Sequence, residues 1–93
     1  MIDLTTVVLA DDHPVYRAGL VKILETADDI KILAEANDGE EAVQLVEKHQ
    51  PDILLLDVSM PRQDGVETAR LCQEKSISSR IIFLTMHQEE ALI

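Results

Sequence analysis

The sequence is poor in aromatic residues, cysteine and basic residues. It contains no tryptophan, one tyrosine and one phenylalanine, so aliphatic side chains must fill most of any core. Its single cysteine, Cys72, excludes a disulfide within the chain, fits a reducing compartment and is expected in the core. Eight Lys and Arg residues stand against eighteen Asp and Glu, for a net charge of −10. This balance argues against direct binding of nucleic acid by this segment.

Long apolar runs, internal repeats and low-complexity linkers are also absent. The apolar stretch near the N-terminus is far too short to span a membrane or to act as a signal peptide. The length of 93 residues lies just below the usual size of a single domain, about 100–150 residues, and allows only one hydrophobic core. We therefore expect one cytoplasmic domain, or part of one, with no membrane segment.

Short apolar runs alternate along the chain with segments of helical periodicity. Two of the runs, Ile53–Leu56 and Ile81–Leu84, are apolar on both faces, which is typical of strands in a parallel sheet between helices. The strict alternation of four strands with three helices predicts a doubly wound α/β sheet. The other two predicted strands are Thr6–Ala10 and Ile30–Ala36, and the predicted helices begin near Pro14, Asp38 and Val66.

Local signals refine these elements. Pro14 suits the first turn of a helix, and Asp38 followed by Glu41 has the form of a capping box. Lys31 and Glu35 are expected on one face of their strand, as on a polar sheet edge. The apolar stripe of the first helix is predicted to comprise Tyr16, Leu20, Ile23, Leu24 and Ala27.

Acidic and hydroxyl side chains occur where the strands end. Asp11 and Asp12 follow the first strand, Asp57 the third, and Thr85 the fourth. In the flavodoxin-like order 2-1-3-4, the first and third strands are neighbours about 4.8 Å apart, so the three carboxylates would share one pocket. Mg²⁺ suits such a pocket, because it prefers oxygen ligands and shares its coordination sphere with phosphoryl oxygens. Asp57 is then the natural nucleophile for a phosphoryl group.

Each of these residues also has a simpler interpretation. Alone, Asp12 is more typical of a helix N-cap, Asp57 could equally be a turn residue, and a threonine at a strand end is unremarkable. A haloacid-dehalogenase-like phosphatase also uses an aspartyl nucleophile with Mg²⁺, but it would need a second aspartate where Ser59 stands. A nucleotide or flavin binder needs a phosphate-binding glycine loop, which the three glycines cannot form. His13 and His87 lack metal-ligand spacing, so neither is assigned to the catalytic site; a structural or subfamily role is expected for His13.

Three segments resemble the receiver domain of two-component response regulators, in the subfamily that usually carries a LuxR-type helix-turn-helix output domain. They are "LADDHPVYRAGL", "DILLLDVSMPRQDGVE" and "IIFLTMHQEEA", and the resemblance covers essentially the whole chain. It implies a phosphoacceptor signalling domain that receives a phosphoryl group from a histidine kinase. The implied site comprises Asp57 as phosphoacceptor; Asp11, Asp12, Asp57 and the backbone carbonyl of Ser59 as Mg²⁺ ligands; Thr85 as the switch hydroxyl; Met60 and Pro61 as loop-shaping residues; and Gly65, whose conformational freedom permits the turn into the next helix.

The sequence itself stops at Ile93, before the resemblance to a whole receiver domain is complete. Receiver domains continue through a fifth strand, which carries a phosphoryl-binding lysine, and a fifth helix. Residues 1–93 are therefore expected to form an incomplete receiver domain, with DNA binding only through a C-terminal output domain that this sequence does not contain. Without a fifth strand, Ile81–Leu84 would form an exposed apolar edge that favours self-association. The missing lysine also leaves open a receiver-like scaffold that takes no phosphate.

Overall fold

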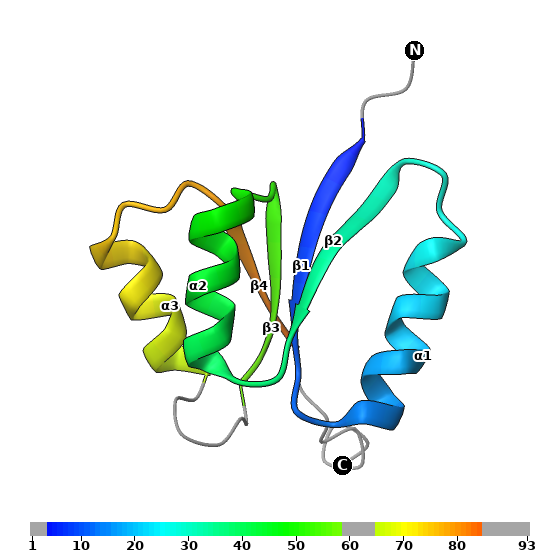
Figure 1. Cartoon of the computed structure of the whole chain (residues 1–93), viewed down its shortest axis with the longest axis horizontal. Helices are drawn as coiled ribbons and strands as arrows, with labels where there is room; N and C mark the ends of the chain where they lie inside the picture. The colour runs from blue at the N-terminus through cyan, green and yellow to red at the C-terminus, as the bar shows by residue number, and fades with distance from the viewer. Residues whose placement is uncertain (1–3, 59–64, 85–93) are drawn as a thin grey trace, which may run out of the picture.

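The computed structural model describes residues 4–58 and 65–84. Strands and helices alternate as predicted: β1 (Thr5–Ala10), α1 (Pro14–Glu25), β2 (Ile30–Ala36), α2 (Gly39–His49), β3 (Ile53–Asp57), α3 (Gly65–Glu74) and β4 (Arg80–Leu84). The strands form one parallel sheet in the order β2-β1-β3-β4, which confirms the flavodoxin-like arrangement (Figure 1). No helix in these two ranges is long and apolar enough to cross a membrane.

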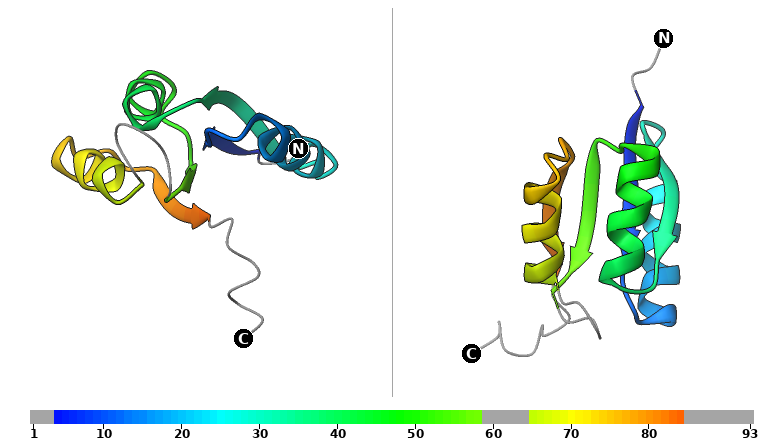
Figure 2. Two further views of the ribbon diagram at one scale, coloured as in Figure 1. Left: turned by 90° about the horizontal axis from the view of Figure 1, so that it is seen from below. Right: turned by 60° about the vertical axis from the view of Figure 1, so that its left-hand side comes forward.

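The helices form two unequal layers around the sheet. Among the described residues, helices α2 and α3 lie together on one face, and α1 lies on the other (Figures 1 and 2). The core is concentrated on the side of α2 and α3, where alternate residues of β1 and β3 point toward these helices. This core includes Cys72, as predicted, and comprises Val8, Ala10, Ala36, Ala42, Val43, Val46, Leu54, Leu56 and Cys72.

Helix α1 is attached more loosely than its apolar stripe predicts, because none of its residues is fully buried. Its partly buried face is centred on Leu20 and Leu24, and Tyr16 lies at one margin. Ile23 falls just beyond that margin and is 66% exposed. Its predicted place in the buried stripe is therefore wrong, because the stripe that contacts the sheet is narrower than the apolar surface of the helix.

Strand β2 contains an irregularity that the sequence pattern does not reveal. The register with β1 shifts between Val7, which pairs with Ile32, and Val8, which pairs with Ala34. Lys31 consequently pairs with Thr6, whereas Glu35 pairs with Leu9. Because Thr6 and Leu9 are three residues apart on a regular strand, they face opposite sides of the sheet. The expectation that Lys31 and Glu35 share a face is therefore wrong, and the extra residue of the bulge is the reason.

Helix α2 begins as its capping signal predicts. The Asp38 carboxylate accepts a hydrogen bond from Glu41 N at 2.9 Å. The Glu41 carboxylate reaches one residue further back than in a standard capping box and accepts from Asn37 N at 2.7 Å. Both contacts fix the turn that follows β2, close to the carboxyl edge of the sheet.

Candidate functional site

Aspartates meet at the carboxyl edge of the sheet, as the strand order predicts. Asp57 is the last residue of β3, and Asp11 directly follows β1. Ala10 pairs with Leu56 in parallel register, so the next residues along the two strands, Asp11 and Asp57, are neighbours. Their exposed fractions are only 0% and 1%. Two ionised carboxylates side by side and shielded from water repel each other strongly unless a cation lies between them.

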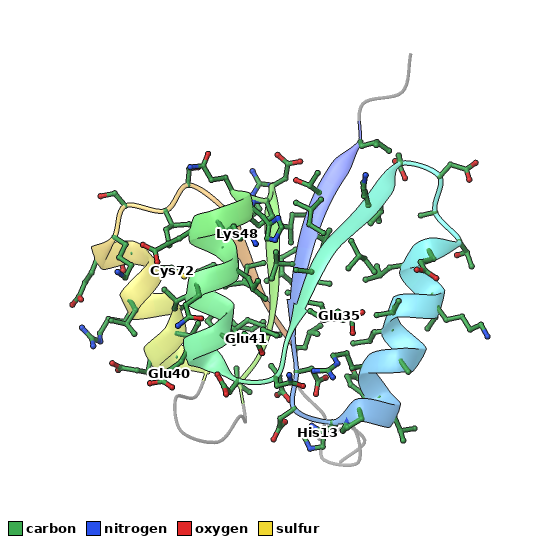
Figure 3. All side chains as sticks on the ribbon, in the orientation of Figure 1. His13, Glu35, Glu40, Glu41, Lys48 and Cys72 are labelled. Carbon is green, nitrogen blue, oxygen red and sulfur yellow. The ribbon has the colours of Figure 1, made fainter. Side chains whose placement is uncertain are left out.

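Asp12 and His13, in the loop between β1 and α1, complete this acidic cluster. His13 Nδ1 lies 2.9 Å from Asp12 Oδ1, 3.1 Å from Asp11 Oδ1 and 3.4 Å from Asp57 Oδ2. One possible ligand atom from each of the four residues lies within 4.8 Å of the others. Figure 3 shows His13 at this end of the molecule, beside the start of α1. The spacing in the sequence does not predict this contact. It arises because the loop turns the His13 ring toward the carboxylates.

The carboxylates favour the protonated form of His13. The hydrogen bond with Asp11 is the largest influence, and it raises the pKa of the imidazole above its usual 6.5. The charges of Asp12, Asp11 and Asp57 act in the same direction, and burial opposes them. His13 N also donates to Asp11 Oδ1 at 2.7 Å. A protonated His13 therefore supplies positive charge to a pocket that is otherwise acidic.

Some oxygen atoms of the acidic cluster are available to a metal ion. Asp11 Oδ2 and Asp12 Oδ1 are buried and accept no hydrogen bond from any residue that the structure describes. His13 Nδ1 is close to Asp12 Oδ1, but only its contact with Asp11 has the geometry of a hydrogen bond. Buried polar atoms normally have partners, so a hard cation that prefers oxygen ligands fits these positions well.

The alternative role of Asp12 as a helix N-cap is wrong. The N-cap residue of α1 is His13, whose side chain makes no capping hydrogen bond, and a proline follows it in the first turn. Proline has no N–H group, so this helix start has one donor fewer to satisfy. The Asp12 carboxylate lies with the acidic cluster instead.

Gly65 lies against the backbone of the same site. A Cβ atom at this position would lie 2.7 Å from Asp57 O and 2.7 Å from Val58 Cα. Gly65 N also donates to Val58 O at 3.2 Å. No glycine in the described ranges has a positive φ, so the predicted need for conformational freedom is wrong. Glycine is required here for space, because α3 begins too close to the end of β3 to admit a side chain.

Several predicted site residues lie outside the described ranges. This is true of the loop residues Ser59, Met60 and Pro61, and of Thr85 and His87 beyond β4. Their assignments stay predictions. Strand β4 ends at Leu84, which pairs with Asp57 in the register of the sheet.

Comparison with known proteins yields one consistent family. A family model described as the response regulator receiver domain matches residues 7–93. The nitrate/nitrite response regulator protein NarL of Escherichia coli strain K12 is 39% identical over 89 residues, which are 94% of this chain and 41% of that protein. The response regulator UvrY of the same organism is 41% identical over 86 residues, which are 92% of this chain and 39% of UvrY. The chain thus spans about two fifths of the length of these curated relatives.

Solved structures agree with this comparison. The signal receiver domain of the putative response regulator NarL from Mycobacterium tuberculosis has a TM-score of 0.88 and 34% identity, over 98% of this chain and 73% of that one. RcsB from Salmonella enterica serovar Typhimurium, solved bound to promoter rprA in the presence of phosphomimetic BeF₃⁻, has a TM-score of 0.82 and 30% identity. That match covers 90% of this chain and 43% of RcsB.

Proposed function

Because the chain belongs to the response regulator receiver domain family, we propose that Asp57 is its phosphoacceptor and that a histidine kinase is the donor. The observation that carries this proposal is the burial of Asp57 beside Asp11 at the end of β3, with Asp12 in the same cluster. A buried carboxylate at the edge of a rigid sheet is held in one orientation, which favours in-line attack. The chain is a signalling domain, and in this proposal it assists its own phosphorylation and dephosphorylation without a separate substrate.

The transfer conserves the phosphoryl group. A carboxylate oxygen of Asp57 attacks phosphorus, the bond from phosphorus to the kinase histidine breaks, and an acyl phosphate forms on Asp57. Water later attacks the same phosphorus and releases inorganic phosphate together with the free carboxylate. The charges of Asp11 and Asp12 would oppose the approach of a phosphoryl group, so the acidic cluster needs a bound cation for this reaction.

Mg²⁺ is the cation that we propose for the cluster. Asp11, Asp12 and Asp57 would hold it, with the backbone carbonyl of Ser59 as a further ligand. Two carboxylate oxygens, Asp11 Oδ2 and Asp12 Oδ1, accept no hydrogen bond from the described part of the chain, which supports this choice. When bound, Mg²⁺ neutralises charge on the carboxylates and on the transferring oxygens. The remaining family assignments belong to the same proposal: Thr85 as the switch hydroxyl, and Met60 and Pro61 as residues that shape the loop after β3.

The output of this domain is proposed from its relatives. RcsB was solved on promoter DNA with a phosphomimetic, and this chain matches less than half of RcsB. We propose that residues 1–93 are part of a receiver domain whose phosphorylation controls a C-terminal DNA-binding domain, and hence transcription. We further propose that the domain is cytoplasmic, in keeping with its free, buried Cys72.

Phosphoryl transfer to Asp57 can be tested with acetyl phosphate and MgCl₂, followed by intact-mass analysis of the protein. Wild-type protein should gain one phosphoryl group that hydroxylamine removes, as expected of an acyl phosphate. Asp57→Asn should abolish this labelling, because an amide is a far weaker nucleophile than a carboxylate. Asp52→Asn, at the other end of the same strand, is the matched control and should be labelled normally. Undiminished labelling of Asp57→Asn would refute the assignment, and an unlabelled wild-type protein would favour the scaffold.

Self-association through β4 is a separate prediction. Among the described residues β4 pairs only with β3, and its Ile82 and Phe83 are 42% and 48% exposed. An apolar strand edge of this kind is a template for pairing. Burying such side chains contributes about 1.5–3 kcal/mol each, so the 93-residue polypeptide should sediment as a concentration-dependent oligomer. Phe83→Lys should weaken this association, whereas Ile23→Lys on exposed α1 surface should not. A concentration-independent monomer of the unmodified polypeptide would contradict the prediction.

A further inference from the structure

One basic side chain, Arg17 in α1, contacts the backbone of the loop that carries Asp11 and Asp12. The side chain is only 16% exposed. Its Nη1 lies 2.7 Å from the backbone oxygen of Asp11, 3.1 Å from that of Ala36 and 2.9 Å from Asn37 Oδ1. An arginine Nη1 has two hydrogens, so at least one is shared between two of these oxygens. The guanidinium therefore joins the carboxyl ends of β1 and β2.

The orientation of the guanidinium is fixed from β2. Arg17 Nε lies 3.3 Å from Glu35 Oε1. Figure 3 shows Glu35 between β2 and α1. This position follows from the bulge in β2, which turns Glu35 to the face of the sheet where α1 lies. A planar guanidinium held by a carboxylate through one edge is well ordered for donation through the other.

The main chain of Arg17 holds the other end of the same loop. Arg17 N donates to His13 O at 2.8 Å, which is the first helical hydrogen bond of α1. Asp11 N donates to Ala36 O at 3.1 Å, the same carbonyl that the Arg17 side chain contacts. The segment from Asp11 to His13 is thus bound at both ends by Arg17, with β2 as the support.

We propose that Arg17 is a positioning residue for the metal site, an inference that rests on the proposed Mg²⁺-dependent function. Arg17 would set the affinity of the site for Mg²⁺ by holding the backbone of Asp11, and through it the carboxylates of Asp11 and Asp12. Partners that orient metal ligands commonly change metal affinity by about 10–100-fold when they are removed.

The electrostatic effect of Arg17 has the opposite sign from its positioning effect. A positive charge near a cation site disfavours binding of the cation, so loss of the charge alone would tighten Mg²⁺ binding. Loss of positioning would weaken it. The sign of the change in affinity therefore distinguishes the two roles.

The experiment is a calorimetric titration of the full chain with MgCl₂, with the melting temperature of each metal-free variant measured in parallel. Arg17→Met keeps the apolar stem but removes every donor, and it should weaken Mg²⁺ binding by about tenfold. Arg17→Lys restores a cationic donor and should recover most of the affinity. Lys22→Met makes a matched change at an exposed lysine in the last turn of α1 and should leave the affinity unchanged. The Mg²⁺ concentration for half-maximal labelling by acetyl phosphate should rise in Arg17→Met, with maximal labelling preserved.

Several outcomes would overturn the inference. Equal or tighter Mg²⁺ binding by folded Arg17→Met, even with a lower melting temperature, would reduce Arg17 to a structural role. If Arg17→Met does not fold, Arg17→Gln replaces it, and the same result in that variant would be decisive. Failure of Arg17→Lys to recover any affinity would also contradict positioning by a cationic donor. If wild-type protein binds no Mg²⁺, the proposed function fails, and this inference fails with it. If wild-type protein binds Mg²⁺ and Asp12→Ala does not, the metal site stands, and the Arg17 variants test only the role of Arg17.

Discussion

Strand β3 has an aspartate at each end, and the two carboxylates have opposite surroundings. Asp52, just before the strand, is exposed, and its Oδ2 accepts hydrogen bonds from Thr6 N at 2.8 Å and Thr6 Oγ1 at 3.0 Å. Asp52 N donates back to Thr6 Oγ1 at 2.9 Å. Asp57, at the far end, is buried next to Asp11 and close to Asp12. The first carboxylate closes a local hydrogen-bonded ring, and the second adds negative charge to a buried cluster.

These surroundings separate a functional acid from a structural one in this fold. An aspartate beside a strand is not informative by itself, because it can serve local structure. Asp52 accepts hydrogen bonds from Thr6, and Asp38, at the start of α2, accepts one from Glu41 N. What distinguishes the carboxyl edge is the accumulation of like charges that few donors from residues 4–58 and 65–84 reach. Such an arrangement lowers stability unless a cation binds, so the buried cluster is a candidate site for one.

The largest expected effect concerns metal binding, where the two kinds of aspartate should differ completely. Asp12→Ala removes a proposed ligand and should weaken Mg²⁺ binding by at least about tenfold, since even outer partners of metal ligands have effects of that size. Asp38→Ala should leave the affinity unchanged and cost about 1 kcal/mol of stability through loss of the α2 cap. Calorimetric titration and chemical denaturation measure the two quantities. Equal Mg²⁺ affinity in both variants would place the metal site elsewhere.

Steric crowding at the carboxyl edge predicts a loss of stability when Gly65 is replaced. Gly65→Ala places a methyl group against the backbone of Asp57 and Val58, which cannot move aside, and should cost about 1–3 kcal/mol of unfolding free energy. Gly19→Ala is the matched control, because nothing lies within 4 Å of the added atom. That change lies inside α1 and should stabilise the protein by about 0.5–1 kcal/mol. Urea denaturation tests both values, and a Gly65→Ala variant as stable as wild type would contradict this steric explanation.

The smallest expected effect is at the amino edge and depends on pH. Hydrogen bonds from the backbone and the hydroxyl of Thr6 lower the pKa of Asp52 below its usual 3.8. Asp52 therefore stabilises the folded state above that pH, and the contribution is lost as pH falls through the lowered pKa of the native carboxyl. The melting temperature of Asp52→Ala should lie below that of wild type at neutral pH and converge with it in acid. Asp28→Ala, in the exposed turn before β2, is the control; a difference that is independent of pH would contradict this account.

Much of the fold could be predicted because it depends on hydrophobic periodicity and on the order of strands and helices, both of which are visible in the sequence. The apolar runs around Leu54 and Ile81 differ in period from the helical segments, and alternation then allows few topologies. The gathering of Asp11, Asp12 and Asp57 follows in turn, because parallel strands end at one edge. Cys72 in the core is a prediction of the same kind, and its 1% exposure confirms it.

What could not be predicted depends on single register shifts and interatomic distances. The bulge opposite Val7 and Val8 changes which face of the sheet Glu35 occupies. No residue type in β2 predicts this bulge. The ion pair between Arg17 and Glu35 depends on the bulge, because it requires Glu35 on the face of the sheet where α1 lies. Glycine is needed at position 65 because a Cβ atom there would lie 2.7 Å from Asp57 O and from Val58 Cα. The sequence pattern shows no such contact and suggests only a local conformational reason for the glycine.

The loose attachment of α1 has a consequence for the dynamics of the domain. Local opening costs least where few side chains are buried, and α1 has no fully buried residue, whereas α2 has four. Amide hydrogens of α1 should therefore exchange with solvent through openings that leave the α2 and α3 side of the sheet intact. Each such opening would also release Arg17 from the ends of β1 and β2. The geometry of the acidic cluster would then follow the local folding equilibrium of one helix, and a ligand that binds the ordered cluster would slow hydrogen exchange along the whole of α1.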